Sequence, residues 1–146
     1  MAKIHILVGT VMGTSLSVAK TAQTVLEGFG HQVHLFETFE ASALDPNTVV
    51  LACTSSTGMG DLPENIVPLY LHLTQDFPRI AGMKYGVISL GDSSYPNFAQ
   101  AGHRLDEAFA DIGAQRTGEI LVLDALSDEA PEKATKIWLE EWQQLI

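Results

Sequence analysis

Cationic residues are scarce in this chain of 146 residues. Eight lysines and arginines stand against eighteen aspartates and glutamates, which gives a formal net charge of −10 at pH 7. Nucleic acids and anionic membranes are bound by clustered cations, so this balance argues against both as partners. An acidic surface favours solubility and speeds the encounter with a basic partner protein.

Cysteine and long apolar runs are also scarce. The single cysteine, Cys53, has no disulfide partner, and its apolar neighbours indicate a small buried side chain. No segment approaches the ~20 apolar residues of a membrane span, and no signal-peptide pattern follows Met1. We therefore expect a cytoplasmic protein in which residues 1–146 form a single domain.

Motifs for metal binding and nucleophilic catalysis are missing as well. The five histidines are scattered, and no cluster of Cys, His and carboxylate residues has the spacing of metal ligands. No G-x-S-x-G nucleophile elbow occurs. The sequence therefore predicts neither a metal site nor a serine hydrolase.

Apolar strand patterns alternate with amphipathic helix patterns along the whole chain. The expected strands are residues 3–8, 32–36, 48–53, 84–90 and 119–124. Four of them are near-continuous apolar runs, which are typical of strands covered by helices on both faces. The repeated order of strand and helix predicts an α/β fold, a three-layer α/β/α sandwich around a five-stranded parallel sheet in the order 2-1-3-4-5.

Four amphipathic helices and one short helix are expected between and after these strands. The first has an apolar face from Val18 to Phe29, the second begins at Pro63 with Asp61 as its candidate cap, and the third ends at Gly113. A short helix is expected within residues 39–44. The last helix starts near Pro131 and carries the apolar residues Ile137, Trp138, Trp142 and Leu145.

The loop after the first strand, residues 9–15, has the composition of a phosphate site. Five of its seven residues are Gly, Thr or Ser, none is charged, and a helix follows at once. Backbone N–H groups at a helix N-terminus bind anions, here with the hydroxyls of Thr10, Thr14 and Ser15. No Lys follows Gly13 and no G-x-G-x-x-G occurs, so a terminal phosphate monoester is expected rather than a nucleotide P-loop or a dinucleotide.

Two further loops, residues 54–61 and 91–98, follow strands that neighbour the first one in this order. Gly58, Gly60 and Gly91 permit close approach of the backbone to a ligand. Tyr95 and Phe98 are placed where an aromatic side chain can stack on a ligand ring. Because the three loops meet at one edge of the sheet, they predict a ligand with a flat ring and a phosphate.

These loops resemble the FMN-binding loops of flavodoxins. The segments are GTVMGTS at 9–15, TGMGDLP at 57–63 and LGDSSYPNF at 90–98. They are most similar to those of small free-standing bacterial flavodoxins and of the FMN domains of cytochrome P450 reductase and sulfite reductase. The resemblance covers essentially the whole chain and implies a flavodoxin-like fold, one non-covalent FMN and a monomer without catalytic residues. It also implies electron transfer between an NADPH-dependent flavodoxin or ferredoxin reductase and acceptor enzymes, and the acidic surface predicts a basic surface on that reductase.

The family pattern, transferred residue by residue, implies four groups of FMN contacts. The phosphate is bound by Thr10, Val11, Met12, Gly13, Thr14 and Ser15. One side of the isoalloxazine ring and its N5 edge are lined by Ser55, Ser56, Thr57, Gly58, Met59, Gly60 and Asp61. The pyrimidine edge and the other face are met by Leu90, Gly91, Asp92, Tyr95, Asn97 and Phe98. Asp124 reaches the ribityl chain.

The chain departs from the family pattern at two positions. Met12 stands where many relatives have Thr, which removes one hydroxyl from the phosphate loop. Thr57 stands where relatives often have an aromatic ring, so one face of the flavin is covered by Met59 or left more open.

Two alternative functions use the same strand order. An FMN-dependent NAD(P)H:quinone-type reductase needs room for a nicotinamide over the ring and usually added loops, for which this short chain has no obvious spare segment. A receiver-type signalling module needs acidic residues at the ends of strands one and three to hold Mg²⁺. This chain has Gly9-Thr10 and Thr54-Ser55 there.

Overall fold

The computed structural model describes residues 1–11, 13–57 and 59–146, so the predicted FMN contacts Met12 and Gly58 lie outside the described residues. Parallel strands form one sheet in the order β2-β1-β3-β4-β5, and β6 also pairs with β4. This is the predicted order. The strands are β1 (Lys3–Gly9), β2 (Gln32–Phe36), β3 (Val49–Ser55), β4 (Lys84–Gly91), β5 (Gln115–Arg116) and β6 (Leu121–Asp124).

The fifth position of the sheet is shared by two short segments, of which the sequence predicted only the second. Strand β5 pairs with the start of β4 and β6 with its end. Between β5 and β6 the chain leaves the sheet. Its carbonyls there accept hydrogen bonds from indole N–H groups: Trp142 Nε1 donates to Thr117 O (3.0 Å), and Trp138 Nε1 donates to Glu119 O (3.1 Å). Strand β5 is polar and exposed, so it carries no apolar run that sequence reasoning detects.

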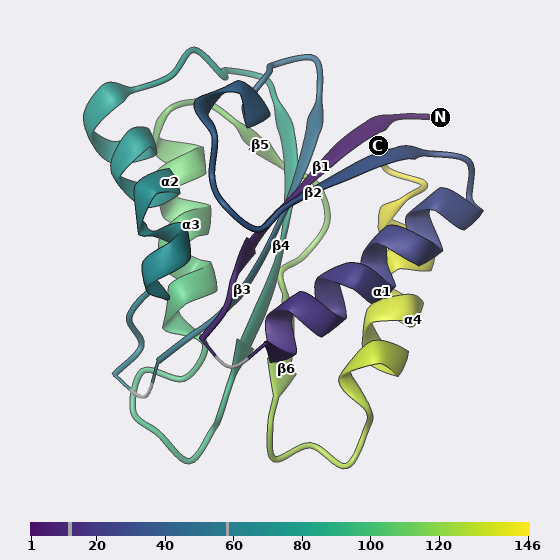
Figure 1. Ribbon diagram of the computed structural model, residues 1–146, viewed down its shortest axis with the longest axis vertical. Coiled ribbons are helices and arrows are strands. Elements are labelled where there is room, and N and C mark those ends of the chain that lie inside the picture. Colours follow the sequence, from purple (N-terminus) through teal and green to yellow (C-terminus); the bar gives the residue numbers. More distant parts are fainter. Residues whose placement is uncertain (12, 58) are drawn as a thin grey trace.

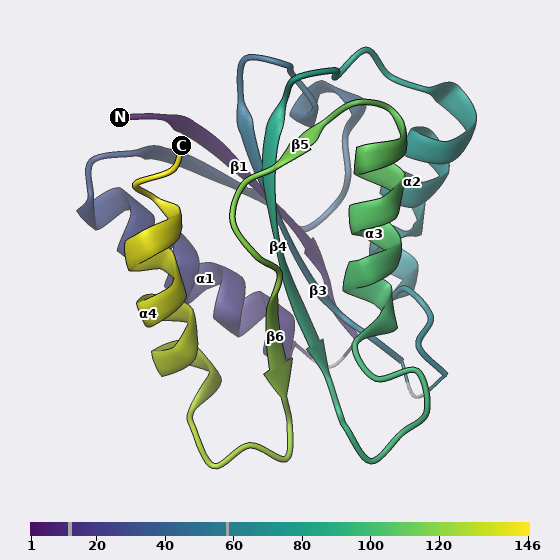
Figure 2. The same ribbon diagram turned by 180° about the vertical axis from the view of Figure 1, so that it is seen from behind.

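Helices cover both faces of the sheet. Helices α1 (Thr14–Gly28) and α4 (Pro131–Trp142) lie on one face, and α2 (Val67–Leu71) and α3 (Gln100–Asp111) lie on the other (Figures 1 and 2). Each face has its own buried cluster, with Leu26 and Trp142 in one and Leu69 and Phe109 in the other. Strands β1, β3 and β4 are therefore buried on both sides, which explains their apolar runs and confirms the three-layer sandwich.

The second helix differs from its prediction. A 3₁₀ turn, η2 (Glu64–Ile66), comes first, then α2, and then one π-helical turn, η3 (His72–Asp76). Pro63 precedes the first turn instead of opening a helix, and Asp61 makes no capping hydrogen bond. Pro68 has no N–H to donate to a carbonyl in the preceding turn. The 3₁₀ turn therefore ends at Ile66, and the α-helix begins as a separate element at Val67. The short helix expected within 39–44 is present as η1 (Ala41–Ala43).

Some apolar residues assigned to helix faces are exposed. Phe29, Ile137 and Leu145 have relative exposures of 48%, 55% and 53%. Phe29 lies beyond the last turn of α1, and Leu145 lies beyond α4. Ile137 is two residues from the nearest buried position, which directs it away from the sheet. The buried positions of α4 are Thr135, Leu139 and Trp142.

The carboxyl ends of β1, β3, β4 and β6 lie at one edge of the sheet, at the bottom of Figure 1. Both chain ends lie at the opposite edge, where His31 links them: Ala2 N donates to His31 Nδ1 (2.9 Å), and His31 Nε2 contacts Gln143 Oε1 (3.1 Å). Within the described part of the chain, no helix has the length and apolar character needed to cross a bilayer.

Candidate functional site

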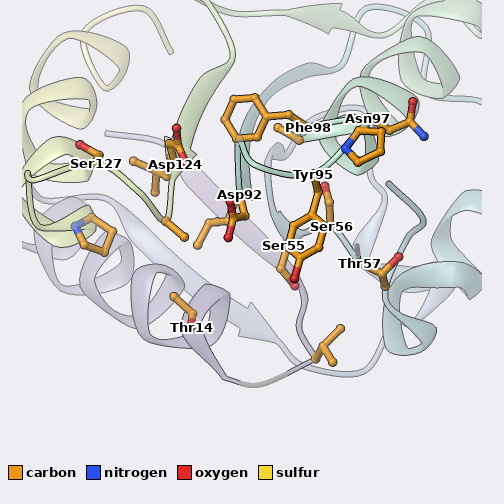
Figure 3. Close-up of a pocket in the computed structure, with 18 of the residues that line it drawn as sticks. Thr14, Ser55, Ser56, Thr57, Asp92, Tyr95, Asn97, Phe98, Asp124 and Ser127 are labelled. Atoms are coloured by element: carbon orange, nitrogen blue, oxygen red, sulfur yellow. The ribbon is translucent and has the colours of Figure 1, made fainter. Parts of the chain in front are cut away.

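A cavity of about 610 Å³ opens at the carboxyl edge of the sheet, among the three predicted loops and the loop after β6 (Figure 3). Its volume is typical of small-molecule sites, which range over about 300–1,000 Å³. The strand order thus brings the loops together as expected. The predicted residues that line the cavity are Val11, Thr14, Ser55, Ser56, Thr57, Leu90, Gly91, Asp92, Tyr95, Asn97, Phe98 and Asp124.

The loop between β1 and α1 divides its hydroxyls between two tasks. Thr10 Oγ1 accepts a hydrogen bond from Gly13 N (2.8 Å), and the buried Ser15 donates to Gly9 O (2.5 Å). These two side chains hold the loop in shape and stand outside the described lining residues, as does Gly13. Gly13 precedes α1 with a φ of 88°, a left-handed conformation that glycine adopts without strain. Thr14 directs its side chain to the cavity (Figure 3).

The loop after β3 is closed by paired hydrogen bonds between Thr57 and Asp61. Thr57 N donates to Asp61 O (3.0 Å), and Asp61 N donates to Thr57 Oγ1 (3.1 Å). Ser56 connects this loop to its neighbours, since its N–H donates to Leu90 O (2.9 Å) and its hydroxyl accepts from Ala101 N (3.1 Å). Three predicted contacts in this loop are absent from the described lining of the cavity: Met59, Gly60 and Asp61.

The loop after β4 contains two residues in a strained conformation. Asn97 and Ala99 have φ values of 59° and 56°, which cost about 1 kcal/mol or more each for residues with a side chain. The buried Ser89 holds this part of the chain by donating to Ala99 O (2.8 Å). Asn97 Nδ2 donates to Met59 O (3.2 Å) and joins this loop to the loop after β3. Tyr95, 55% exposed, stands at the cavity wall.

Asp124 connects the loop after β4 with the loop after β6. Its Oδ1 accepts hydrogen bonds from Ser93 N (3.1 Å) and Leu126 N (3.0 Å). Hydrogen bonding from Ser93, and then from the Leu126 amide, holds the pKa of Asp124 below its usual value. In Figure 3, Asp124 and Ser127 border one side of the cavity, and Tyr95 and Thr57 border the other.

Several lining residues were missed by sequence reasoning. Most belong to the end of β6 and the loop that leads into α4. The rule that all βα loops of a parallel sheet open at one edge, applied to the last strand, predicts this wall. The missed residues are Pro96, Ala99, Leu123, Ala125, Ser127, Glu129 and Pro131.

The electrostatics of the cavity favour binding by dipoles rather than by cations. Asp92, Asp124 and Glu129 are the charged residues among the described lining. The Arg104 guanidinium lies near the loop after β3, with Nη1 3.6 Å from Asp61 Oδ1 and the Tyr70 ring 5.0 Å beneath it. An anionic group at this edge therefore depends on N–H groups and hydroxyls, in particular those at the start of α1.

The thiol of Cys53 lies outside the described lining of the cavity. Cys53 is buried in β3, as predicted, and burial raises the pKa of its thiol to about 12. Across the described residues, no group of three or more His, Cys, Asp or Glu side chains is placed to hold a metal ion.

Known proteins with similar sequences and structures agree with this geometry. The family model for flavodoxin matches residues 6–138. The chain is 45% identical to flavodoxin YqcA of Pectobacterium carotovorum subsp. carotovorum, over 100% of this chain and 98% of that protein. It is 43% identical to flavodoxin YqcA of Escherichia coli K12, over 100% and 99% of the two chains. A solved variant of a Pseudomonas aeruginosa flavodoxin superposes with a TM-score of 0.90 at 35% identity, covering 98% of this chain and 97% of its own.

These matches confirm the resemblance to flavodoxins over essentially the whole chain. They also agree with the strand order that the sheet displays. The chain therefore belongs to the flavodoxin family and is an FMN-binding electron-transfer protein.

Proposed function

We propose that this protein carries electrons between a basic-surfaced, NADPH-dependent reductase and acceptor enzymes, with one FMN in the cavity at the carboxyl edge of the sheet. The chemistry of the cavity supports this proposal most directly. It combines the aromatic wall of Tyr95 and Phe98 with the N-terminus of α1 at Thr14, so it suits both a flat ring and a phosphate. When bound, FMN supplies the redox chemistry.

The residues of the site have distinct roles in this proposal. Thr14 and the N–H groups of the first turn of α1 bind the phosphate, while Thr10 and Ser15 maintain the loop. Tyr95 packs against the ring, and Asp124 faces the ribityl chain. The backbone of Leu90, Gly91 and Asp92 meets the pyrimidine edge. The hydrogen bonds from the loop after β3 to the loop after β4 and to α3 support this arrangement, because they hold the walls of the cavity in place.

The surface around the cavity supports a carrier that docks with other proteins. Four apolar side chains of the surrounding loops are 55–70% exposed: Val11, Met59, Tyr95 and Leu126. The same loops carry Asp61, Asp92 and Asp128. Exposed apolar groups beside one sign of charge suit a transient interface with a partner of opposite charge.

The salt dependence of reduction tests the docking proposal. The rate at which an NADPH-dependent flavodoxin reductase reduces the holoprotein should fall as ionic strength rises, because charged surfaces steer the encounter. Asp128→Asn, in the loop between β6 and α4, should slow reduction at low salt and flatten the salt dependence. The matched control is Glu27→Gln, at the far end of α1, which should leave both unchanged. A rate independent of salt would contradict electrostatic docking.

The same experiment separates a carrier from a reductase. A carrier needs the partner protein, so the holoprotein with NADPH alone should keep its oxidised flavin spectrum. Rapid bleaching by NADPH alone would contradict the carrier proposal and favour an NAD(P)H-dependent enzyme.

We further propose that the protein acts in the cytoplasm as a monomer, with residues 1–146 as one domain. The free, buried thiol of Cys53 supports a reducing compartment such as the cytoplasm, and the continuous sheet supports a single domain. Sedimentation of the holoprotein should give the mass of one chain, 15.8 kDa plus one FMN.

A further inference from the structure

Asn65 makes three hydrogen bonds to segments outside its own turn. It lies in η2, and its Oδ1 accepts from Thr10 N (2.9 Å). Its Nδ2 donates to Val8 O (2.9 Å) and to Glu37 O (3.1 Å). A backbone N–H only donates and a carbonyl only accepts, so these partners fix the orientation of the amide without ambiguity.

The partners of Asn65 show what the amide holds together. Val8 is near the end of β1, Thr10 opens the loop before α1, and Glu37 follows β2. The η2 turn also packs closely against the end of β1, since a Cβ added to Gly9 would lie 2.8 Å from Ile66 Cγ2. The loop before α1 is thus fixed by η2 from outside, in addition to the bonds that Thr10 and Ser15 make within it.

We propose that Asn65 is a positioning residue for the phosphate of FMN, acting through the conformation of the described loop residues before α1, 10–11 and 13–15. The inference rests on the proposed function, in which that loop binds the phosphate. Asn65 occupies the N–H of Thr10, so the phosphate is bound by groups further along, at Thr14 and the first turn of α1. A loop held in its binding conformation loses less conformational entropy when the ligand binds, which raises affinity.

The test compares FMN with riboflavin, which lacks the phosphate. For Asn65→Ala, the dissociation constant of FMN should rise about tenfold, equivalent to about 1.4 kcal/mol. The dissociation constant of riboflavin should stay within about twofold, because it does not use the loop. Asn47→Ala, in the exposed turn before β3, is the matched control and should change neither value. Binding is measured by quenching of flavin fluorescence, and folding by circular dichroism.

A second variant keeps the test decisive if Asn65→Ala folds poorly. Asn65→Asp keeps the shape and the acceptor for Thr10 N, but it directs an oxygen instead of an N–H group at Val8 O and Glu37 O. Asn65→Asp should raise the dissociation constant of FMN at least as much as Asn65→Ala does, and it should again leave the dissociation constant of riboflavin unchanged.

Three results would overturn the inference. An equal loss of affinity for FMN and riboflavin would show that Asn65 stabilises the fold in general and has no specific effect on the phosphate. Unchanged affinity for both ligands would show that the loop keeps its shape without it. A wild-type protein that binds neither ligand would overturn the proposed function and the inference together, whereas FMN binding that Asn65 variants leave intact would overturn the inference alone.

Discussion

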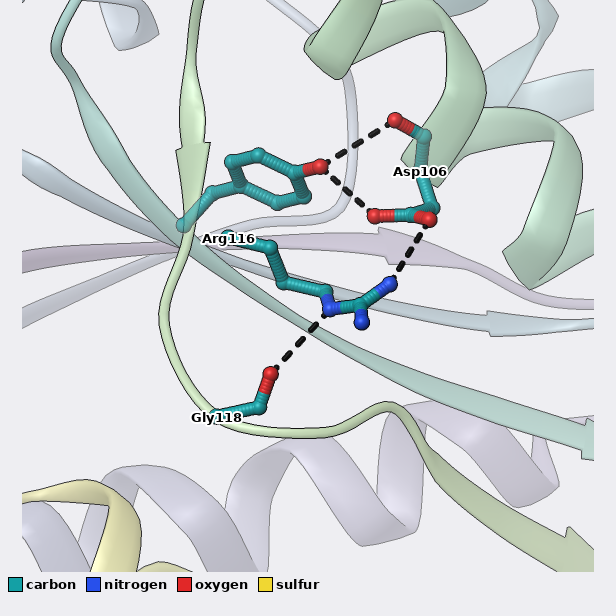
Figure 4. Close-up of polar contacts among 4 residues, drawn as sticks. Asp106, Arg116 and Gly118 are labelled. Atoms are coloured by element: carbon teal, nitrogen blue, oxygen red, sulfur yellow. Dashed lines mark hydrogen bonds and ion pairs between the residues drawn. The ribbon is translucent and has the colours of Figure 1, made fainter.

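Replacing Tyr85 with phenylalanine removes one hydroxyl from a partly buried polar network beside α3. Tyr85 is 1% exposed, and its hydroxyl donates to Asp106 Oδ1 (2.6 Å), with Asp106 O 3.1 Å from the same hydroxyl. The other carboxylate oxygen of Asp106 contacts Arg116 Nη1 (2.9 Å), and Arg116 Nε donates to Gly118 O (3.1 Å) (Figure 4). The phenyl ring of the variant keeps the stacking on Phe109, whose centroid is 4.7 Å away. The substitution therefore isolates the hydroxyl.

The expected loss of unfolding free energy at neutral pH is about 2 kcal/mol, since a hydrogen bond to a charged group contributes about 1.5–3 kcal/mol. The loss depends on pH. Burial, and then the Asp106 carboxylate, raise the pKa of Tyr85 well above the ordinary value of 10.0. Above pH 10 the unfolded wild type loses this proton while the folded protein keeps it, so wild-type stability falls by about 1.4 kcal/mol per pH unit. The advantage over Tyr85→Phe should shrink above pH 10 and vanish near about pH 11.5.

Denaturant unfolding of both proteins between pH 7 and pH 11.5, followed by circular dichroism, measures this difference. Cys53 also titrates in this range, but it is present in both proteins and cancels in the comparison. A stability difference that is constant over the whole pH range would refute the reasoning, and so would a variant as stable as the wild type at pH 7.

Three further predictions concern the site and the core. Tyr95→Ala should raise the dissociation constant of FMN about two- to tenfold, because stacked aromatic rings contribute about 0.5–1.5 kcal/mol. The control Phe77→Ala, at an exposed residue, should leave the dissociation constant unchanged. A weaker effect at Tyr95 than at Phe77 would contradict the assigned ring contact. Asp124→Ala should be less stable than wild type at pH 7, and the difference should disappear as the pH falls through the lowered pKa of Asp124, below 3.8; a difference that persists at lower pH would contradict the role of the carboxylate. Cys53 should react with thiol reagents only as the protein opens, because at a pKa of about 12 about one thiol in ten thousand is ionised at pH 8; immediate labelling of the native protein would contradict its burial.

The sheet was predictable because burial on both faces leaves a direct mark on sequence. Strands β1, β3 and β4 are covered by helices on each side, so their apolar runs extend over the whole strand. Strand β5 has no such mark, since Gln115 and Arg116 are both exposed and pair only with the start of β4. Its place depends on the tryptophans of α4, which are more than twenty residues away in the sequence and bind the carbonyls of the following segment.

The candidate site was predictable where loop composition is unusual. Glycine, hydroxyl and aromatic residues marked the loops after β1, β3 and β4, and the cavity lies among them. The wall formed by Leu123 and Ala125 has ordinary composition, so only topology identifies it. Asn65 is a polar residue within a helical apolar pattern, and its role depends on contacts with residues 28 to 57 positions away. Sequence spacing holds no information about such contacts.

Titration of the FMN-free protein with FMN measures whether this cavity binds the cofactor. Flavin fluorescence should be quenched with an end point at one FMN per chain, and Tyr95→Ala should shift the affinity without changing this stoichiometry. Fluorescence that stays at the level of free FMN throughout the titration would contradict the claim that this cavity binds FMN.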